Sequence, residues 1–263
     1  MTTPLYQIDA FTSQAFAGNP ACVVMLDKKR EDAWMAALAA EMNLSETAFL
    51  LPRDGVYSLR WFTPAAEVAL CGHATLASAH ILWEGGYLQE NEPAVFETLS
   101  GRLGAVKKGD WIEMDFPAFS AEEVPFPEGL ADMLGGEPLE AFDTGESLMV
   151  VYVSPEEVSA LAPDFTRIAQ LPYQGVMPTA KGDGAPYDFV SRYFAPRVGV
   201  DEDPVTGSAH SSLCPFWAKR LGKEEMLAQQ VSKRGGVLRV RAMGERVVIA
   251  GQAVTVFSGE LLV

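Results

Sequence analysis

The residues best suited to acid–base or nucleophilic chemistry gather in two short segments of the chain. All three histidines, His73, His80 and His210, lie there, as does Cys71, and Cys214 follows one helical turn after His210. Histidine is the side chain whose ordinary pKa lies nearest to neutrality, and a cysteine thiolate is a strong nucleophile. These two segments are therefore the first candidates for an active site.

The two segments are copies of one pattern. The first reads Arg60-Trp61-Phe62-Thr63-Pro64 and then Cys71-Gly72-His73-Ala74-Thr75, and the second reads Arg192-Tyr193-Phe194-Ala195-Pro196 and then Thr206-Gly207-Ser208-Ala209-His210. The gap between proline and glycine is three residues longer in the second copy. Each copy predicts a strand, a turn and a helix, with apolar runs over residues 76–83 and 213–221. A repeat spaced by half the chain indicates two similar lobes with one site in the cleft between them.

Each copy places a glycine where its helix begins. The first amides of a helix have no acceptor within it and the helix dipole favours negative charge, so such an end binds anions. Glycine at 72 and 207 lets a ligand approach the backbone closely. The two ends would therefore hold one small carboxylate. The alternative is that Thr206 and Ser208 only cap the second helix, and the duplication favours the anion site.

Acidic residues stand near both segments. Asp201, Glu202 and Asp203 precede the second helix, where acids are ordinary partners of the helix dipole. Asp203 is expected nearest to the cleft, where it and Ser208 would flank one ligand group. Glu46 stands between a predicted helix end and a strand, a position at which a lone glutamate usually lies on the surface.

Cys71 has two interpretations. Next to a helix N-terminus the pKa of its thiol would be lowered, whereas within an apolar run a cysteine packs as a small buried hydrophobe. His73 and His80 lack the spacing and partners of a zinc helix, and the chain has no phosphate-binding loop, dinucleotide fingerprint or serine-nucleophile elbow. The sequence therefore predicts no metal and no other cofactor.

The composition limits the class of protein. The 263 residues suit one large domain or two lobes, and the formal net charge of −15 argues against a nucleic-acid partner. The N-terminus lacks the basic and apolar regions of a signal peptide, and no segment has the composition of a membrane span. Three cysteines without metal spacing argue against a disulfide framework. We expect a cytoplasmic protein that binds neither nucleic acid nor membrane.

The rest of the chain predicts strands with interspersed helices. We expect strands over 5–11, 21–26, 48–51, 57–62, 94–98, 104–107, 111–116, 147–153, 175–178, 187–194, 237–242, 246–250, 253–257 and 260–263, and helices over 31–42 and from 155. Because many strands are linked as hairpins, the pattern predicts an α+β fold rather than a doubly wound parallel sheet. The segment 117–136 is rich in Pro, Glu and Gly, so we place the lobe boundary within it. The two lobes are then 1–117 and 118–252.

Six blocks follow one another along the chain: Asp9-Ala10-Phe11, Gly18-Asn19-Pro20-Ala21, Asn43-Leu44-Ser45-Glu46-Thr47-Ala48-Phe49, Arg60-Trp61-Phe62-Thr63-Pro64, Cys71-Gly72-His73-Ala74-Thr75 and Asp203-Pro204-Val205-Thr206-Gly207-Ser208-Ala209. Together they resemble the PhzF-like family, the phenazine-biosynthesis isomerase and its relatives. The family is similar in fold to diaminopimelate epimerase. The resemblance implies two pseudo-symmetric lobes, each a barrel-like, mostly antiparallel sheet around a central helix. It also implies that the strands at about 253–263 rejoin the first lobe, and that the protein is a homodimer.

The resemblance also assigns the site. It implies that Glu46 is the acid–base catalyst and that His73, Asp203 and Ser208 support it. The substrate-binding positions would be Cys71, Gly72, Ala74, Thr206 and Gly207. Diaminopimelate epimerase uses one thiol from each lobe, but here the second position is Thr206, whose hydroxyl is no base at neutral pH. A one-sided proton shuttle by Glu46 is therefore expected.

The sequence thus predicts a cofactor-independent isomerase that shifts a proton between carbons of a small carboxylate-bearing substrate, with Glu46 as base and then acid. One alternative is an epimerase or racemase that uses Cys71. Another is a protein that binds a small acid without catalysis on the same fold. Proton–deuterium exchange on a bound ligand separates an enzyme from a binder, and inversion of a stereocentre separates an epimerase from an isomerase.

Overall fold

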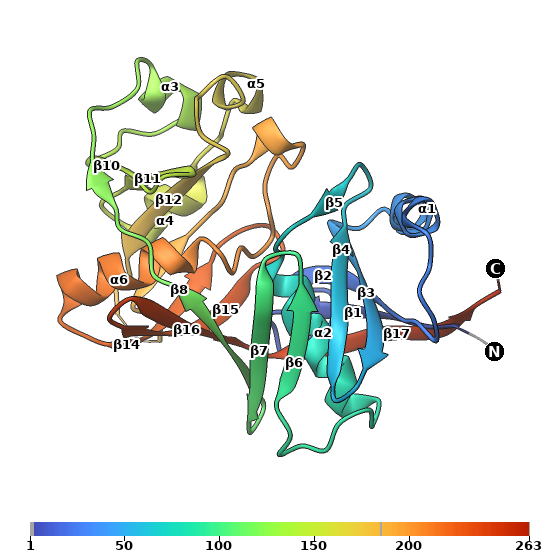
Figure 1. Ribbon diagram of the computed structural model, residues 1–263. Coiled ribbons are helices and arrows are strands. Elements are labelled where there is room, and N and C mark those ends of the chain that lie inside the picture. The colour runs from blue at the N-terminus through green and yellow to red at the C-terminus, as the bar shows by residue number, and fades with distance from the viewer. Residues whose placement is uncertain (1–2, 185, 263) are drawn as a thin grey trace. The chain divides into compact units, whose positions relative to one another are not determined.

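The computed structural model describes residues 3–184 and 186–262, and the chain divides into two compact units (Figure 1). Unit 1 comprises Met1–Asp115 and Ala250–Val263, and unit 2 comprises Phe116–Ile249. Both units combine a mostly antiparallel sheet with a small number of helices, which confirms the predicted α+β class.

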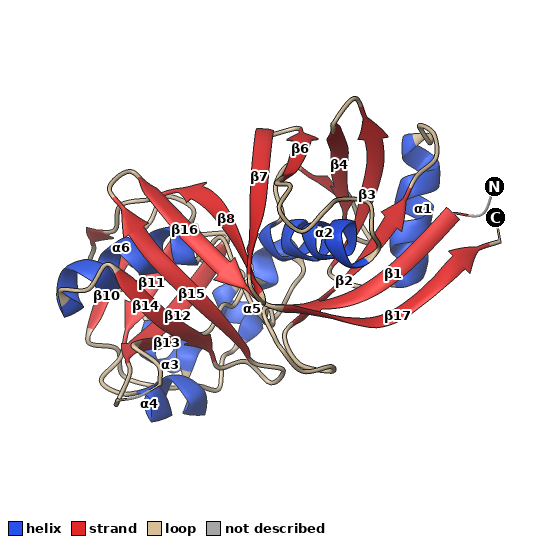
Figure 2. Ribbon diagram, turned by 90° about the horizontal axis from the view of Figure 1, so that it is seen from below, coloured by secondary structure: helices blue, strands red, loops and turns tan. Residues whose placement is uncertain are grey.

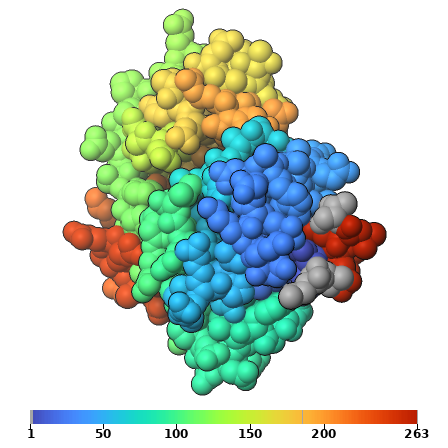
Figure 3. All heavy atoms as spheres, turned by 45° about the vertical axis from the view of Figure 1, so that its right-hand side comes forward, coloured from blue at the N-terminus to red at the C-terminus, as the bar shows by residue number. Residues whose placement is uncertain are grey.

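In the sheet of unit 1 the first and the last strand of the chain lie side by side. Its strands are β1 (Thr3–Ala10), β2 (Asn19–Met25), β3 (Glu46–Arg53), β4 (Val56–Phe62), β5 (Glu67–Val68), β6 (Ala94–Thr98), β7 (Gly101–Lys108), β8 (Trp111–Pro117) and β17 (Ala253–Leu261). β17 pairs with β1, and from there the order is β2, β3, β4, β6, β7 and β8, with β5 beside β4. Only the β2–β3 and β4–β6 pairs are parallel among these. The C-terminal segment, in red, accordingly lies at the surface beside the blue N-terminal segment (Figure 3).

Unit 2 repeats this order of strands. Its strands are β9 (Glu122–Glu123), β10 (Glu140–Asp143), β11 (Ser147–Val151), β12 (Gly175–Lys181), β13 (Phe189–Ser191), β14 (Glu225–Gln230), β15 (Gly236–Met243) and β16 (Arg246–Gly251). From β10 to β15 successive pairs are antiparallel, parallel, antiparallel, parallel and antiparallel. The pairs from β1 to β7 follow the same succession, so the repeat in the sequence belongs to two copies of one sheet.

Each parallel pair requires a crossover, and the crossovers carry the helices. In unit 1, α1 (Asp32–Met42) joins β2 to β3, and α2 (Gly72–Glu84) joins β4 to β6. In unit 2 the first crossover carries α4 (Pro155–Ala160) and α5 (Phe165–Ile168), and the second carries the short helix η1 (Pro196–Val198) and α6 (His210–Leu221). A further short helix, α3 (Leu130–Leu134), precedes β10. The helices α2 and α6 therefore occupy equivalent places, as the repeat predicted.

Helix α2 is the centre of unit 1. Residues 72–79 and 81–83 are all buried, because the helix is apolar or small-sided on every face and contacts β1, β2, β3 and β17. Figure 2 shows the strands of unit 1 curving around it. Its buried hydroxyls bond within the helix: Ser78 donates to the carbonyl of Ala74 and Thr75 to that of Cys71. The predicted central helix of this lobe is thus confirmed.

Helix α6 is the counterpart in unit 2, and it contains a proline. Pro215 has no N–H to donate to the carbonyl of Ser211. The amide of Phe119 donates to that carbonyl instead, at 2.9 Å. The buried carbonyl therefore keeps a partner and the helix continues to Leu221 with Leu213, Cys214 and Trp217 in the core.

Some predicted elements differ from the structure. The hairpin expected over 253–257 and 260–263 is the single strand β17, because pairing with β1 continues through Gly259; residue 263 lies outside the described residues. β14 was not predicted, because the inward-facing Gln230 interrupts the apolar alternation of Met226 and Ala228. Helix α1 ends where expected, at Asn43 with φ 50°. No helix in the described ranges has both the length and the apolar character that crossing a membrane requires.

Candidate active site

Three of the predicted site residues meet in unit 1. Glu46 is the first residue of β3, Cys71 is the N-cap of α2, and His73 lies in the first turn of that helix. Oε2 of Glu46 lies 3.1 Å from Nε2 of His73, and Sγ of Cys71 lies 3.5 Å from Nδ1 of the same ring. The imidazole therefore stands between a carboxylate and a thiol.

The local structure explains why these groups converge. Asn43 turns the chain out of α1 in the left-handed region, so that β3 starts at Glu46, opposite Ala21 of β2. On the helix side, the carbonyl of Cys71 accepts both the amide of Thr75, at 3.2 Å, and its hydroxyl, at 2.5 Å. The start of α2 is thus fixed, and Gly72 and Ala74 lie in the same turn as His73.

Charge and burial act against each other at His73. Burial lowers the pKa of the imidazole, but Cys71 and the Glu46 carboxylate both raise it, and the net direction is well above the ordinary value. The pKa of the Cys71 thiol is also raised, by burial first and then by the charge of Glu46. We therefore assign a neutral Cys71 thiol beside a protonated His73 imidazole at neutral pH. The amide of Ala74 at the start of the helix does lower the pKa of Cys71, but burial and Glu46 outweigh it, so the net direction is opposite to a lowered pKa.

The two closest atoms of this pair lack a proper hydrogen bond. Oε2 of Glu46 and Nε2 of His73 are both buried, and neither has a hydrogen-bond partner among the described residues, although they lie within ion-pair distance of each other. Buried polar groups in folded proteins are nearly always hydrogen-bonded. Two adjacent exceptions on titratable side chains make this pair the candidate active site.

Glu46, Cys71 and His73 are also donor types that bind metal ions, and their candidate ligand atoms lie within 4.8 Å of one another. The imidazole faces the thiol through Nδ1 and the carboxylate through Nε2. A single ion binds only one of these nitrogens, so binding all three side chains would require one of the two ring contacts to change. The geometry suits proton exchange along the three groups better than a three-ligand metal centre.

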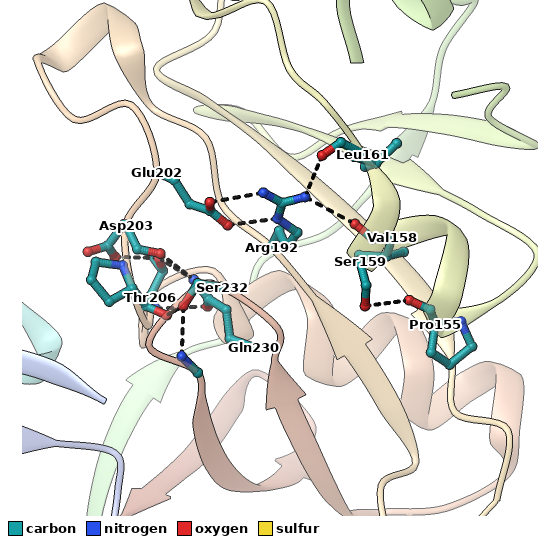
Figure 4. A network of polar contacts seen from close by, with 12 residues as sticks. Pro155, Val158, Ser159, Leu161, Arg192, Glu202, Asp203, Thr206, Gln230 and Ser232 are labelled. Carbon is teal, nitrogen blue, oxygen red and sulfur yellow. Dashed lines mark hydrogen bonds and ion pairs between the residues drawn. The ribbon is translucent and has the colours of Figure 1, made fainter. Parts of the chain in front are cut away.

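In unit 2 the predicted residues Asp203 and Thr206 form one network with Gln230 (Figure 4). The Thr206 hydroxyl donates to the Asp203 carboxylate. The Gln230 amide group donates to the carbonyl of Asp203 at 2.8 Å and accepts the Thr206 amide at 2.9 Å. Ser232 donates to the carbonyl of Pro204 at 2.6 Å. The end of β14 therefore holds the segment that precedes α6.

Ser208 lies outside that network. Its residue is exposed, and helix α6 has Ala209 as N-cap with no side-chain hydrogen bond. The alternative in which Thr206 and Ser208 cap the helix is therefore wrong. Gly207, Ser208 and Ala209 form a turn whose carbonyls accept the first amides of α6, so the helix proper begins at His210 rather than at Gly207.

His210, which sequence reasoning left without a role, is fully buried, and its Nδ1–H donates to the carbonyl of Thr206 at 2.9 Å. Thr75 makes the equivalent bond to Cys71 in the first copy. Burial lowers the pKa of His210 to about 4, so the ring is neutral at neutral pH. It is a structural counterpart of Thr75, whereas Ser208 is aligned with His73.

Sequence reasoning also missed the contacts of five residues that hold these segments, namely Arg60, Glu67, Arg192, Glu202 and Gln230. Glu202 was expected to partner the helix dipole, but it pairs with Arg192. Arg60 pairs with Glu67 in the same way. The only available signal was that Arg60 and Arg192 open the two copies of the repeat. No feature of the sequence pointed to Gln230, because its strand was not predicted.

Comparison with known proteins gives consistent matches over the whole chain. Residues 8–259 match the model of a family described as phenazine biosynthesis-like protein. An uncharacterized isomerase of Halalkalibacterium halodurans is 51% identical over 263 residues, covering 100% of this chain and 99% of that protein. An uncharacterized isomerase of Pseudomonas aeruginosa is 49% identical over 261 residues, covering 99% of each.

Solved structures agree with these matches. The crystal structure of a PhzF family protein from Enterococcus faecalis has a TM-score of 0.96 and 42% sequence identity, covering 100% of both chains. A hydroxyproline epimerase from Agrobacterium vitis has a TM-score of 0.62 at 13% identity, covering 99% of this chain and 92% of that one. The second likeness concerns the fold alone.

Proposed function

The chain belongs to the phenazine biosynthesis-like family, and from this premise we propose that it shifts a proton between two carbons of a small carboxylate-bearing substrate without a cofactor. The family membership confirms the resemblance of the six sequence blocks. Relatives aligned over the whole chain are named isomerases, and the protein is an isomerase of this family. The substrate, the catalytic residue and the independence from cofactors are our proposals.

The observation that carries the proposal is the pair of Glu46 and His73, whose facing atoms are buried. Oε2 of Glu46 lies 3.1 Å from the imidazole of His73, whose pKa is raised, so Glu46 would act as the base while its neighbour carries the positive charge. Neither Oε2 of Glu46 nor Nε2 of His73 has a hydrogen-bond partner among the described residues. A substrate carbon with an acidic C–H would face a base with an open acceptor position.

The proposed reaction conserves protons and electrons. The C–H bond breaks, its proton bonds to Glu46, and the electron pair shifts into the adjoining carbons toward the substrate carboxylate. The O–H bond of Glu46 then breaks and the proton bonds to a second carbon. The amides at Gly72 and His73, in the first turn of α2, would bind the carboxylate and stabilise the developing charge.

From the sequence repeat we also propose that the turn at Gly207 binds the same substrate. Ser208 is exposed, and the backbone of residues 207–209 contributes its carbonyls, not its amides, to the start of α6. Asp203 would act mainly by fixing Thr206, to which it is hydrogen-bonded. A cytoplasmic location and a homodimer remain predictions from the sequence.

A second function is favoured by one contact. The Sγ of Cys71 lies 3.5 Å from Nδ1 of His73. If Glu46 took a proton from one face of a substrate carbon, the S–H bond of Cys71 could break and its proton bond to the opposite face, leaving a thiolate beside the His73 imidazolium. That would make the protein an epimerase. The raised pKa of Cys71 makes its thiol a poor base at neutral pH, so we place this function second.

The test is exchange in D2O. The protein is incubated with a panel of small saturated and unsaturated carboxylic acids, and mass spectrometry and NMR record deuterium at carbon, a shifted double bond or an inverted centre. We expect deuterium incorporation with a shifted double bond, and its loss in Glu46→Gln. Inversion without a shifted double bond would support the epimerase, and undiminished exchange by Glu46→Gln would remove Glu46 from the role.

A further inference from the structure

The two copies of the repeat contain the same arginine–glutamate contact. Arg60 lies on β4, and Arg192 directly follows β13, the equivalent strand. Nε and Nη2 of Arg60 donate to the two carboxylate oxygens of Glu67 at 2.6 and 2.7 Å. The same atoms of Arg192 donate to the two oxygens of Glu202 at 2.7 and 2.9 Å (Figure 4).

The third donor group of each guanidinium contacts the first crossover of its own unit. Nη1 of Arg60 donates at 2.7 Å to Asp32, in the first turn of α1. Nη1 of Arg192 donates to the carbonyls of Leu161, at 2.9 Å, and Val158, at 3.3 Å, at the end of α4. Each arginine therefore connects two crossovers of its unit. It binds a glutamate in the second crossover, which carries the candidate site residues, and it also contacts a helix in the first crossover.

The position of the glutamates links the contact to the site. Glu67 stands four residues before Cys71, and Glu202 stands four residues before Thr206. The two partners are seven residues apart in the first copy and ten in the second. The three extra residues thus lie between arginine and glutamate, so the spacing from the glutamate to the site segment is the same in both copies.

The contacts are suited to holding geometry. A bidentate arginine–carboxylate pair fixes orientation as well as distance. The side chains are only 24% exposed for both Arg60 and Glu67, and 11% and 19% for Arg192 and Glu202. Each guanidinium also lies over a ring, that of Phe62 at 5.1 Å or Phe194 at 4.7 Å. They are therefore more restrained than an ordinary surface ion pair.

We propose that Arg60 and Arg192 are positioning residues that, with Glu67 and Glu202, fix the segments at Cys71–His73 and at Asp203–Thr206. The inference rests on the proposed function only in that these segments carry its site residues. Arg60 sets where the first turn of α2 begins, and Arg192 sets where the turn before α6 begins. Neither arginine contacts the reacting atoms in this role.

The three histidines allow a test that needs no substrate. His73 belongs to the first segment, and His210 reports on the second because its Nδ1–H donates to the carbonyl of Thr206. His80, which contacts Glu84 and Thr255, serves as the internal reference. NMR of the protein labelled with ¹³C and ¹⁵N in histidine side chains would follow the pKa of His73 and the tautomer of His210 in Arg60→Gln and Arg192→Gln.

We expect Arg60→Gln to shift the pKa of His73 by about 0.5 unit or more, and to leave His80 and His210 unchanged. Arg192→Gln should alter the Nδ1 signal of His210 and leave the signals of His73 and His80 unchanged. The matched control is Arg220→Gln, because Arg220 makes a bidentate pair with Glu140 and stacks over Phe216 in the last turns of α6, away from the segments at Cys71–His73 and Asp203–Thr206. It should change none of the three histidines.

If either glutamine variant fails to fold, Arg60→Lys and Arg192→Lys replace it, because lysine keeps the positive charge but cannot form the bidentate contact with the glutamate. Smaller changes in the same histidine signals are then expected. Folded variants that lose stability while His73 and His210 keep wild-type signals would show a purely stabilising role and overturn the proposal. So would equal changes in Arg220→Gln. Exchange in D2O plays no part in these signals, so a failure of the proposed function would be recognised separately.

Discussion

Oε2 of Glu46 and Nε2 of His73 lie 3.1 Å apart, in a buried pair that differs from the other glutamate–histidine pair of unit 1. In that second pair, Glu84 and His80 are 3.3 Å apart, the Glu84 side chain is 51% exposed, and Nε2 of His80 also contacts the Thr255 hydroxyl. Burial dominates at His80 and lowers its pKa, whereas neighbouring groups outweigh burial at His73 and raise its pKa. The same two side-chain types therefore form one pair with a half-exposed glutamate and a hydrogen-bonded histidine, and one pair whose facing atoms are buried and lack a hydrogen-bond partner among the described residues.

This contrast supplies a matched pair of variants. Glu46→Gln preserves shape and removes the base, so exchange into a substrate should fall by about 100-fold or more, as expected for general acid–base catalysis. Glu84→Gln makes the identical change on the exposed pair and should leave the rate near that of the wild type. Rates of deuterium incorporation, measured with one acid that the wild type labels, compare the two. Equal rates for both variants would assign the proton transfer to another residue.

The raised pKa of His73 predicts a pH dependence of stability. An unfolded histidine titrates near 6.5, and the folded one titrates higher, so between these values the folded state binds more protons. The stabilisation from His73 is then fully present below pH 6.5 and is lost as the pH rises through the folded pKa. The free energy of unfolding of the wild type, minus that of His73→Asn, should therefore decrease with rising pH. Urea unfolding from about pH 6 to 9 measures it; a difference that increases over this range would mean that His73 is buried as a neutral ring.

The sequence was most informative where repetition and periodicity agreed. The two Cys/Thr-Gly segments predicted equivalent helices, and α2 and α6 occupy equivalent crossovers. The contact between Glu46 and His73 followed only from family resemblance, because it joins a strand end to a helix start. The two arginine–glutamate contacts were not predicted, because the spacing differs between the copies. Glu67 lies seven residues after Arg60, whereas Glu202 lies ten residues after Arg192. Pairings of this kind depend on how a loop returns to its strand, which residue spacing alone does not determine.

Cys71 is expected to be dispensable for the isomerase. Burial raises the pKa of its thiol, so it is protonated at neutral pH and unsuited as a base. Cys71→Ser should retain most of the exchange rate and lose a little stability, because a hydroxyl replaces a buried thiol. Exchange in D2O and thermal unfolding test the two parts. If exchange disappears in a Cys71→Ser protein that unfolds cooperatively, the epimerase function becomes the preferred one.

His210 predicts the opposite pH dependence, at the acidic side. Its pKa is lowered from 6.5 to about 4 by burial, so between these values the unfolded chain binds a proton that the folded one excludes. Stability falls as the pH drops from 6.5 towards 4, by on the order of 3 kcal/mol at most from this residue. His210→Asn keeps a donor for the Thr206 carbonyl and should flatten that part of the profile. Urea unfolding between about pH 4 and 7 gives both curves, and parallel curves would contradict the assignment.

The last prediction concerns the two glycines at which the repeat places anion binding. Neither Gly72 nor Gly207 has a positive φ, so alanine is compatible with the backbone at both positions while its Cβ crowds an approaching anion. Sulfate serves as the probe, and its binding should raise the melting temperature of the wild type relative to sodium chloride at equal ionic strength. Gly72→Ala and Gly207→Ala should each reduce that shift. If both glycines act on one anion, the double variant should lose less than the sum of the single losses. Strictly additive losses would indicate two separate anion sites. Undiminished shifts in both single variants would mean that the repeat reflects only the duplicated sheet and its central helices.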